Sequence, residues 1–391
     1  MPHVAGLRGV LPEPSKLAEV IAAPVAPFDL PRGLADRALV RDSGLAVYRY
    51  HQTFAGPGNR AFTRKSTFCA VRLSAWTDGA IRPHEATTQA QRDVALAKIR
   101  ANKGHTDAIL CGVRDAASEV DRLFRKVEGA RATIELTTPD GTVHKLWRAQ
   151  DAELIGKLRN YFTPKKLHLL EGHDVYEGML AYREELASKG ELIMYSSANY
   201  GLACIVPMDD PALFAAARHR VIRGVTVTSE TVIAAAKKHF IVEQLPGAGS
   251  DLAKVFNSLA ENLAHQPAFV AVFAGEPDAW KLTLSPEVSL ISEGIKVDRA
   301  LQKLDPIVVE HLFVERQLAG AQVSTELDAR KAIAALATGA NVVLITRPLT
   351  VGQIAHVDEL GQLLPPQSTA FHPPMAAGIV SLIIDPDEDL A

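Results

Sequence analysis

The chain has 391 residues, 47% of them hydrophobic, which is enough to bury a large core and to form two domains or one elaborated domain. Its 45 acidic and 42 basic residues give a formal net charge of -3, which excludes a global electrostatic attraction to nucleic acids or anionic membranes. No apolar run long enough to cross a membrane occurs, so we expect a cytoplasmic protein.

The cysteines do not indicate a covalent framework. Cys69, Cys111 and Cys204 are far apart and odd in number, and none belongs to a Cys-x-x-Cys pair. This pattern supports neither a set of disulfides nor a cysteine zinc site. We therefore expect three reduced and mostly buried thiols.

The first part of the chain predicts paired strands and a surface helix. Residues 45–54 and 65–74 alternate between apolar and polar side chains and are rich in aromatic and β-branched types, so we expect two strands that pair. Apolar residues recur at helical spacing over 89–101. Residues 106–111 then predict a buried strand.

A hairpin and a further helix follow. The dipeptide Asp140-Gly141 lies between alternating runs at 132–138 and 142–148, and both residues tolerate positive φ. We therefore interpret Asp140 as a turn residue with no role in chemistry. Residues 152–161 predict an amphipathic helix.

The most informative segment begins at Leu167. Leu167 to Leu170 predicts an apolar strand, and Glu171-Gly172-His173-Asp174 interrupts it before a helix that extends to about Ser188. The unpaired N–H groups and the dipole at a helix N-terminus favour an anion such as phosphate. A binding site is therefore expected at this junction.

After residue 223 the pattern changes to a regular alternation of helices and strands. This alternation predicts a second α/β layer, so we expect domains at 1–223 and 224–391 and a mixed α+β or α/β fold. The elements are expected at 229–239, 250–265, 268–274, 280–284, 298–318, 325–338, 342–346 and 351–360.

Several short motifs are weak when taken alone. Gly247 to Leu252 lacks the third glycine of a dinucleotide fingerprint, and Ser250 fits better as the N-cap of a helix. His84-Glu85 is not followed by a second histidine one helical turn later, which excludes a zincin helix. Taken alone, His219-Arg220 is typical of ordinary surface charge.

In order along the chain, however, these fragments resemble the domain-of-unknown-function family 1015. That family is distantly similar to the ParB/sulfiredoxin-like superfamily and its free serine kinases, which implies a ParB/sulfiredoxin-like portion within residues 1–223. The resemblance is carried by Ala23 to Asp29, Arg82-Pro83-His84-Glu85-Ala86-Thr87, Asp140-Gly141 with His144 and Trp147, Glu171 to Leu180, His219-Arg220, and Leu364 to Thr369 with Phe371 and Gly378.

The resemblance implies a site for nucleotide-dependent phosphoryl transfer. In the related serine kinases, an acidic residue near the N-terminal motif deprotonates a substrate hydroxyl. By that resemblance Glu85 is the candidate base, and His84 is its orienting or phosphate-facing neighbour.

The same resemblance implies a phosphate-binding group. The Gly172 backbone and the His173 side chain are the expected phosphate cradle, and His219 and Arg220 would add positive charge. We expect one pocket to be formed by the His84-Glu85 region, the Gly172 junction and the His219-Arg220 pair.

The chain departs from the family pattern where phosphate binding needs charge. The family's Asp-Gly-His-His-Arg is Glu171-Gly172-His173-Asp174-Val175 here, Gln367 replaces a lysine, and Pro374 replaces a second one. Asp174 would repel phosphate. A bound Mg²⁺ reverses that argument if Glu171 and Asp174 are its ligands, and both interpretations stay open.

The leading hypothesis is a nucleotide-dependent phosphotransferase-like protein that acts on a small, serine-like metabolite carrying a hydroxyl group. Its cofactors would be a nucleoside di- or triphosphate of unknown base and Mg²⁺. The alternative is a catalytically degenerate nucleotide or metabolite sensor. A ParB-like DNA-associated protein is the weakest hypothesis, because the chain is acidic and has no basic stripe. The expected partner is the small-molecule substrate, with a homodimer as an open alternative.

Overall fold

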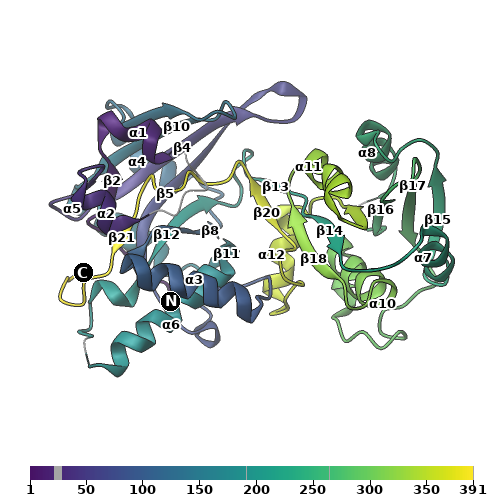
Figure 1. Cartoon of the computed structure of the whole chain (residues 1–391). Coiled ribbons are helices and arrows are strands. Elements are labelled where there is room, and N and C mark those ends of the chain that lie inside the picture. The colour runs from purple at the N-terminus through teal and green to yellow at the C-terminus, as the bar shows by residue number, and fades with distance from the viewer. Residues whose placement is uncertain (22–28, 191, 264, 391) are drawn as a thin grey trace. The chain divides into compact units, whose positions relative to one another are not determined.

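The computed structural model describes residues 1–21, 29–190, 192–263 and 265–390, and it divides into two compact units (Figure 1). Unit 1 consists of Met1–Phe214 and Phe371–Ala391, and unit 2 consists of Ala215–Ala370. This division differs from the boundary expected after residue 223, because the chain returns to unit 1 at Phe371. Of the expected motif Ala23 to Asp29, only Asp29 lies within the described residues.

Unit 1 is built on a large mixed sheet in the order β6-β11-β8-β12-β5-β4-β10-β9, with β1 paired to β5. The expected mixed fold class is therefore confirmed. Its strands are β1 Val4–Ala5, β4 Val47–Ala55, β5 Ala61–Arg72, β6 Ile81–Arg82, β8 Ile109–Val113, β9 Ile134–Thr137, β10 Val143–Ala149, β11 Leu167–Glu171 and β12 Tyr200–Pro207. Two small sheets pair β2 (Val10–Pro12) with β3 (Leu39–Arg41), and β7 (Gly104–His105) with β21 (Leu382–Ile383).

Several sequence predictions are confirmed in this sheet. β4 and β5 pair antiparallel from Tyr48↔Phe68 to Ala55↔Ala61. β9 and β10 form the expected hairpin, in which Gly141 has a φ of 84° and Asp140 accepts the backbone N–H of Thr142. All three cysteines are free and buried.

The sheet has two different faces because its side chains alternate. One face carries a continuous apolar core that includes Val47, Cys69, Cys111 and Ile205, with residues of α5 and α6 packed against it. The opposite face carries buried polar side chains, described below. The helices of unit 1 are α1 Leu17–Ile21, α2 Leu30–Ala35, α3 Gln89–Asn102, α4 Glu119–Glu128, α5 Ala152–Phe162 and α6 His173–Ser188.

Helix α6 is fixed in place by its contact with α3. A Cβ added at Gly178 of α6 would lie 3.1 Å from the Cβ of Ala95 and from the backbone N of Leu96, so a larger residue would push the two helices slightly apart. Thr88 and Gln91 form a capping box that starts α3 where the sequence predicts a helix. Helices α3 and α6 therefore pack in close contact.

Unit 2 contains a six-stranded antiparallel sheet in the order β15-β17-β16-β19-β14-β18. Its strands are β14 His219–Arg223, β15 Phe240–Leu245, β16 Ala268–Phe273, β17 Ala279–Leu284, β18 Gln322–Glu326 and β19 Val342–Ile345. Its α-helices are α7 Ser229–Ala236, α8 Leu252–Ala260, α9 Asp305–Val308, α10 Glu315–Gln317, α11 Ala329–Ala334 and α12 Val351–Glu359. Strands β13 (Phe214–Ala216) and β20 (Ala370–His372) contain the two boundaries between the units.

Three predictions in unit 2 need correction. Asp251, and not Ser250, caps α8 by accepting the backbone N–H of Lys254. The expected element at 298–318 is broken, and a π-helical turn over Val309–Val314 lies between α9 and α10. The expected single element at 325–338 is divided. Its first residues belong to strand β18, and the helix α11 starts only after its N-cap Asp328.

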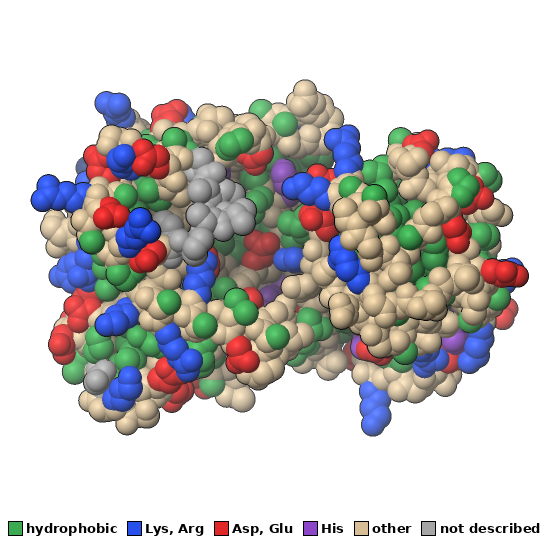
Figure 2. All heavy atoms as spheres, viewed as in Figure 1, with side chains coloured by type: hydrophobic (Ala, Val, Ile, Leu, Met, Phe, Trp, Pro, Cys, Tyr) green, Lys and Arg blue, Asp and Glu red, His purple; other side chains and the backbone are tan. Residues whose placement is uncertain are grey.

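Charges of both signs are interspersed over the face shown in Figure 2. Among the described residues, no helix has both the length and the apolarity that a membrane span requires.

Candidate functional site

The junction between β11 and α6 has the predicted strand, glycine and helix order. Gly172 has a φ of 85° and a ψ of 37°, a left-handed conformation that reverses the chain between the strand and the helix. The first backbone bond within α6 runs from the Tyr176 N–H to the Gly172 carbonyl. The N–H groups of His173, Asp174 and Val175 therefore have no acceptor within the helix.

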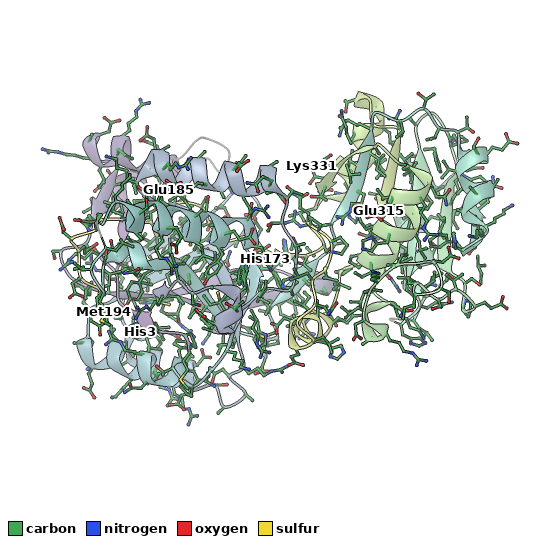
Figure 3. The ribbon with its side chains drawn as sticks, turned by 90° about the horizontal axis from the view of Figure 1, so that it is seen from below. His3, His173, Glu185, Met194, Glu315 and Lys331 are labelled. Carbon is green, nitrogen blue, oxygen red and sulfur yellow. The ribbon has the colours of Figure 1, made fainter. Side chains whose placement is uncertain are left out.

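His84 and His173 meet at this junction, and Figure 3 labels His173 in unit 1. The His84 backbone N–H donates to Nε2 of His173 at 3.3 Å. The two rings are edge to face, with centroids 4.6 Å apart. The structure thus brings together two histidines that are far apart in the sequence.

Both imidazoles are neutral. Burial lowers the pKa of His84 to about 4, and burial together with the nearby His84 lowers the pKa of His173 well below its usual value. Nε2 of His173 accepts the hydrogen bond from the His84 N–H, so the neutral ring carries its own hydrogen on Nδ1. Nδ1 of His84 lies 2.7 Å from the Leu169 carbonyl, which fixes the same tautomer there.

The Nδ1–H of His173 is a directed donor at the start of a helix. Its side chain is only 5% exposed, and within the described ranges the structure gives Nδ1 no acceptor. A donor of this kind can bond to an oxygen acceptor from a ligand. It supplies a hydrogen bond but no positive charge.

The carboxylates of the site are more accessible than its imidazoles. Glu85, which follows His84, and Asp174, in the first turn of α6, are both partly exposed. Among the described residues, no group of three or more His, Cys, Asp or Glu side chains is arranged to hold a metal ion. A Mg²⁺ ion at Glu171 and Asp174 would therefore need ligands from phosphate and water.

A β-bulge turns Glu171 toward the polar face of the sheet. β11 pairs with β8 at Leu169↔Cys111 and then at Glu171↔Leu110, so Leu170 is the extra residue. Without the bulge, Glu171 would follow Leu169 onto the apolar face. Its Oε1 instead accepts the backbone N–H of Phe371 at 2.8 Å.

A row of polar side chains that was not predicted from the sequence crosses this face. Gln52 of β4 pairs in register with Arg64 of β5 and with His144 of β10. All three side chains are at most 3% exposed. One sequence signal could have indicated this row. Gln52 and Arg64 are polar residues within strands whose other residues are mostly apolar or buried.

His144 connects Tyr50 to the hairpin turn. The Tyr50 hydroxyl lies 2.6 Å from Nδ1 of His144, and Nε2 of His144 lies 3.0 Å from Oγ1 of Thr138, which donates to Asp140. Burial lowers the pKa of His144 to about 4 and raises the pKa of Tyr50. Asp140 thus keeps the turn role assigned from sequence and also ends a hydrogen-bonded chain.

His219 and Arg220 belong to unit 2, where both are 3% exposed on β14 and are not ordinary surface residues. Nδ1 of His219 accepts the Thr346 N–H at 3.2 Å, and burial lowers the His219 pKa to about 4. Arg220 donates to the Gln367 carbonyl at 2.6 Å. Their expected contribution to the site stays a prediction.

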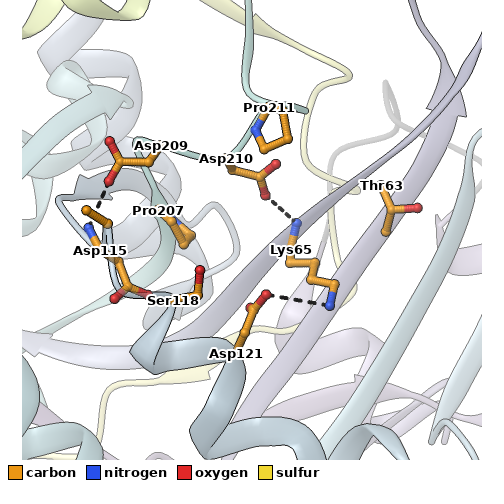
Figure 4. Close-up of a pocket in the computed structure, with 10 residues that line it drawn as sticks. Thr63, Lys65, Asp115, Ser118, Asp121, Pro207, Asp209, Asp210 and Pro211 are labelled. Atoms are coloured by element: carbon orange, nitrogen blue, oxygen red, sulfur yellow. Dashed lines mark hydrogen bonds and ion pairs between the residues drawn. The ribbon is translucent and has the colours of Figure 1, made fainter.

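A pocket of about 360 Å³ lies at the carboxyl ends of the parallel strands β8 and β12 (Figure 4). Such strand ends are a common place for ligands. Its lining carries one lysine, Lys65, against the carboxylates of Asp115, Asp121, Asp209 and Asp210. This balance repels phosphate, so the pocket does not compete with the junction as an anion site.

Asp115 and its neighbours in this pocket already have structural roles. The Asp115 carboxylate accepts the backbone N–H groups of Glu119 and Val120 at the start of α4. Asp209 accepts the N–H of Asp115, and Asp210 accepts that of Lys65. The acidic pocket is therefore explained by turns and helix capping.

Comparison with known proteins supplies a family. A family model described as a protein of unknown function (DUF1015) matches residues 26–307. No curated protein matches the sequence.

Several solved structures are distantly similar. A free serine kinase in complex with AMP is 13% identical, with a TM-score of 0.40 over 80% of this chain and 88% of that one. A conserved hypothetical protein from Pyrococcus furiosus is 12% identical, with a TM-score of 0.39 over 79% and 91% of the two chains. Staphylococcus aureus SbnI with a C-terminal truncation is 10% identical, with a TM-score of 0.39 over 82% and 90%.

Proposed function

The chain belongs to the DUF1015 family, and we propose that it binds a nucleoside di- or triphosphate at the β11–α6 junction and transfers phosphate to a small metabolite that carries a hydroxyl group. The observation that carries this proposal is the His173 Nδ1–H, a donor on a largely buried side chain that stands at the N-terminus of a helix. Donors converging at a helix N-terminus are a recurrent phosphate site.

The proposal gives each residue a defined role. The Gly172 backbone and His173 hold a nucleotide phosphate, and His84 fixes the orientation of His173 through its backbone N–H. Glu85 follows His84 and is partly exposed, so it is the candidate base. As the acceptor oxygen bonds to phosphorus, its proton passes to Glu85 and the bond to the leaving nucleotide breaks.

Mg²⁺ is part of the proposal because the junction itself brings no positive charge. His84 and His173 are neutral, and Val175 stands where the family pattern has an arginine. Glu171 and Asp174 would hold the ion, which would neutralise the phosphate. Because His219 and Arg220 already bond within unit 2, we assign the phosphate contact to unit 1 alone.

One observation favours a second function. The neutral histidine pair and the acidic Asp174 suit weak, metal-dependent binding better than rapid turnover, which supports a nucleotide or metabolite sensor. The ParB/sulfiredoxin-like relationship stays a proposal for unit 1. DNA association remains the weakest hypothesis, as charges of both signs are mixed on the visible surface (Figure 2).

Calorimetric titration with ADP and ATP, each with Mg²⁺ and with a chelator, tests binding. We expect affinity with Mg²⁺ and a marked loss without it. Incubation with serine and the bound nucleotide, followed by detection of phosphoserine, then separates an enzyme from a sensor. Absence of binding to either nucleotide in both conditions would remove the proposal.

A further inference from the structure

The segment Phe371–Ala376, named here the C-terminal strap, lies on the polar face of the unit 1 sheet and is held through its backbone. Arg64 donates to the carbonyls of His372, at 3.4 Å, and Pro373, at 2.6 Å. Gln52 donates to the Pro374 carbonyl at 2.8 Å. The sheet therefore grips main-chain groups of the strap at three consecutive residues.

Both ends of the strap have further contacts. The Phe371 N–H donates to Oε1 of Glu171 at 2.8 Å. The Ala376 N–H lies 3.4 Å from the Tyr50 hydroxyl. The strap thus connects the polar row on β4 and β5 to the bulge that presents Glu171 at the candidate site.

Arg64 has an unusual environment for a buried cation. It is 1% exposed, and among the described residues it forms no ion pair with a carboxylate. Its acceptors are the Gln52 side chain and two strap carbonyls, while its buried Nε has no partner. Burying a charge with neutral partners costs stability, so the arginine is poorly explained by packing alone.

Glu171 is close enough to influence that charge. Burial lowers the pKa of Arg64, and the nearby Cys204 and then the Glu171 carboxylate oppose that effect. The guanidinium nevertheless stays protonated because its reference pKa is far above neutrality. Arg64 and Glu171 therefore interact both through space and through the strap.

We propose that Arg64 is a positioning residue for Glu171, acting through the C-terminal strap. Arg64 fixes the carbonyls of His372 and Pro373, and this aligns the Phe371 N–H with Oε1 of Glu171. Oε1 is then held in one orientation beside the β11–α6 junction. This inference rests on the proposed function only in assigning the fixed carboxylate to a Mg²⁺–nucleotide complex.

The first measurement does not need nucleotide. Amide hydrogen exchange at Phe371 is followed by NMR in the full chain, in Arg64→Met, and in the control Arg72→Met. Arg72 is an exposed residue at the end of the same strand. We expect exchange at Phe371 to accelerate at least tenfold in Arg64→Met and to stay unchanged in Arg72→Met, with unfolding midpoints measured alongside.

Gln52→Ala, which removes one support of Arg64, is the second variant if Arg64→Met does not fold. Unchanged exchange at Phe371 in the folded variant would overturn the inference.

The second measurement separates positioning from general support of the fold. The ratio of ADP affinities with and without Mg²⁺ is compared between the wild type, Arg64→Met and Arg64→Lys. If Arg64 positions Glu171, Arg64→Met changes this ratio several-fold and Arg64→Lys, which keeps the charge, changes it less. If Arg64→Met lowers ADP affinity by the same factor with and without Mg²⁺, Arg64 has only a structural role. If the wild type binds no nucleotide, the proposed function fails, whereas the exchange measurement still decides the strap contact.

Discussion

The backbone N–H of His84 donates to Nε2 of His173, and the two imidazoles cross at 81°. This contact joins the loop after β6 to the first residue of α6, two segments far apart in sequence. It also requires that Nε2 of His173 stays unprotonated. The geometry of the candidate site therefore depends on pH.

The first prediction concerns that dependence. The pKa of His84 is lowered to about 4 by burial, whereas an unfolded histidine titrates near pH 6.5. Between these values the unfolded chain binds a proton that the folded chain does not, so stability is complete above about pH 6.5 and decreases as pH falls toward 4. Urea unfolding from pH 7 to 4.5 should show this decrease, with a smaller slope in His84→Asn. The control His356→Asn, at an exposed position of unit 2, should keep the wild-type slope, and an equal reduction of the slope in both variants would contradict the assignment.

The second prediction restores charge to the junction. Asp174→His with Val175→Arg removes an acidic group and adds a forked, permanently charged donor. A charge-assisted contact contributes about 1.5 to 3 kcal/mol, so ADP affinity should rise roughly tenfold or more. Glu184→Arg adds comparable charge in the penultimate turn of the same helix and should have little effect. Unchanged or weaker binding in the double variant would mean that the phosphate contact lies elsewhere.

The third prediction tests the base. Glu85→Gln, made in that restored background, keeps the shape of the side chain but cannot take the hydroxyl proton. Phosphoserine formation should fall by about 10² to 10⁴ while ADP affinity changes little. If the restored protein binds nucleotide but never phosphorylates serine or a similar metabolite, the sensor function is favoured.

The fourth prediction uses two glycines that flank α6. Gly172 and Gly190 both have positive φ, but a Cβ at Gly172 would lie 3.2 Å from Cγ2 of Ile109, whereas a Cβ at Gly190 meets nothing within 4 Å. Alanine at either site should cost about 1 to 2 kcal/mol for the left-handed backbone. Gly172→Ala should cost more and should also weaken ADP binding. Equal free energies of unfolding for the two variants would argue against a close approach at Gly172.

The fifth prediction concerns the apolar face of the unit 1 sheet. Burial alone would raise the pKa of Glu128, but the hydrogen bond with His51 and the charge of Arg49 outweigh it and lower the pKa to about 2. The stabilisation is therefore present above about pH 4.5 and lost as pH falls toward 2. Glu128→Gln should lower the unfolding free energy at pH 7 and flatten this acid dependence, because Arg49 is fully buried. A variant as stable as the wild type would show that Asp121 alone compensates Arg49.

Local patterns were sufficient for many elements and insufficient for the polar face of the sheet. Alternation predicted β4 and β5, Asp140-Gly141 predicted the hairpin, and the break at Gly172 predicted the start of α6. The strap could not be predicted, because its contacts with Arg64 and Gln52 use backbone groups and leave no pattern in the strap's own sequence.

The bulge at Leu170 shows a second limit. A strict period of two would place Glu171 on the apolar face beside Leu169, and one extra residue reverses that orientation. No residue type near Leu170 signals the bulge. The partner of Glu171 was therefore missed even though Glu171 itself was identified as a site residue.

The return of the chain to unit 1 at Phe371 also sets an order of events during synthesis. Arg64 and Glu171 are translated long before the strap. All of unit 2 emerges from the ribosome after Glu171 and before Phe371. Until Phe371 to Ala376 have been made, the arginine lacks its main-chain acceptors and the glutamate lacks its donor. A nascent chain that stops at residue 370 would hold an unfinished polar face open to water and to chaperones, so the proposed site in unit 1 becomes complete only after all of unit 2 has been translated.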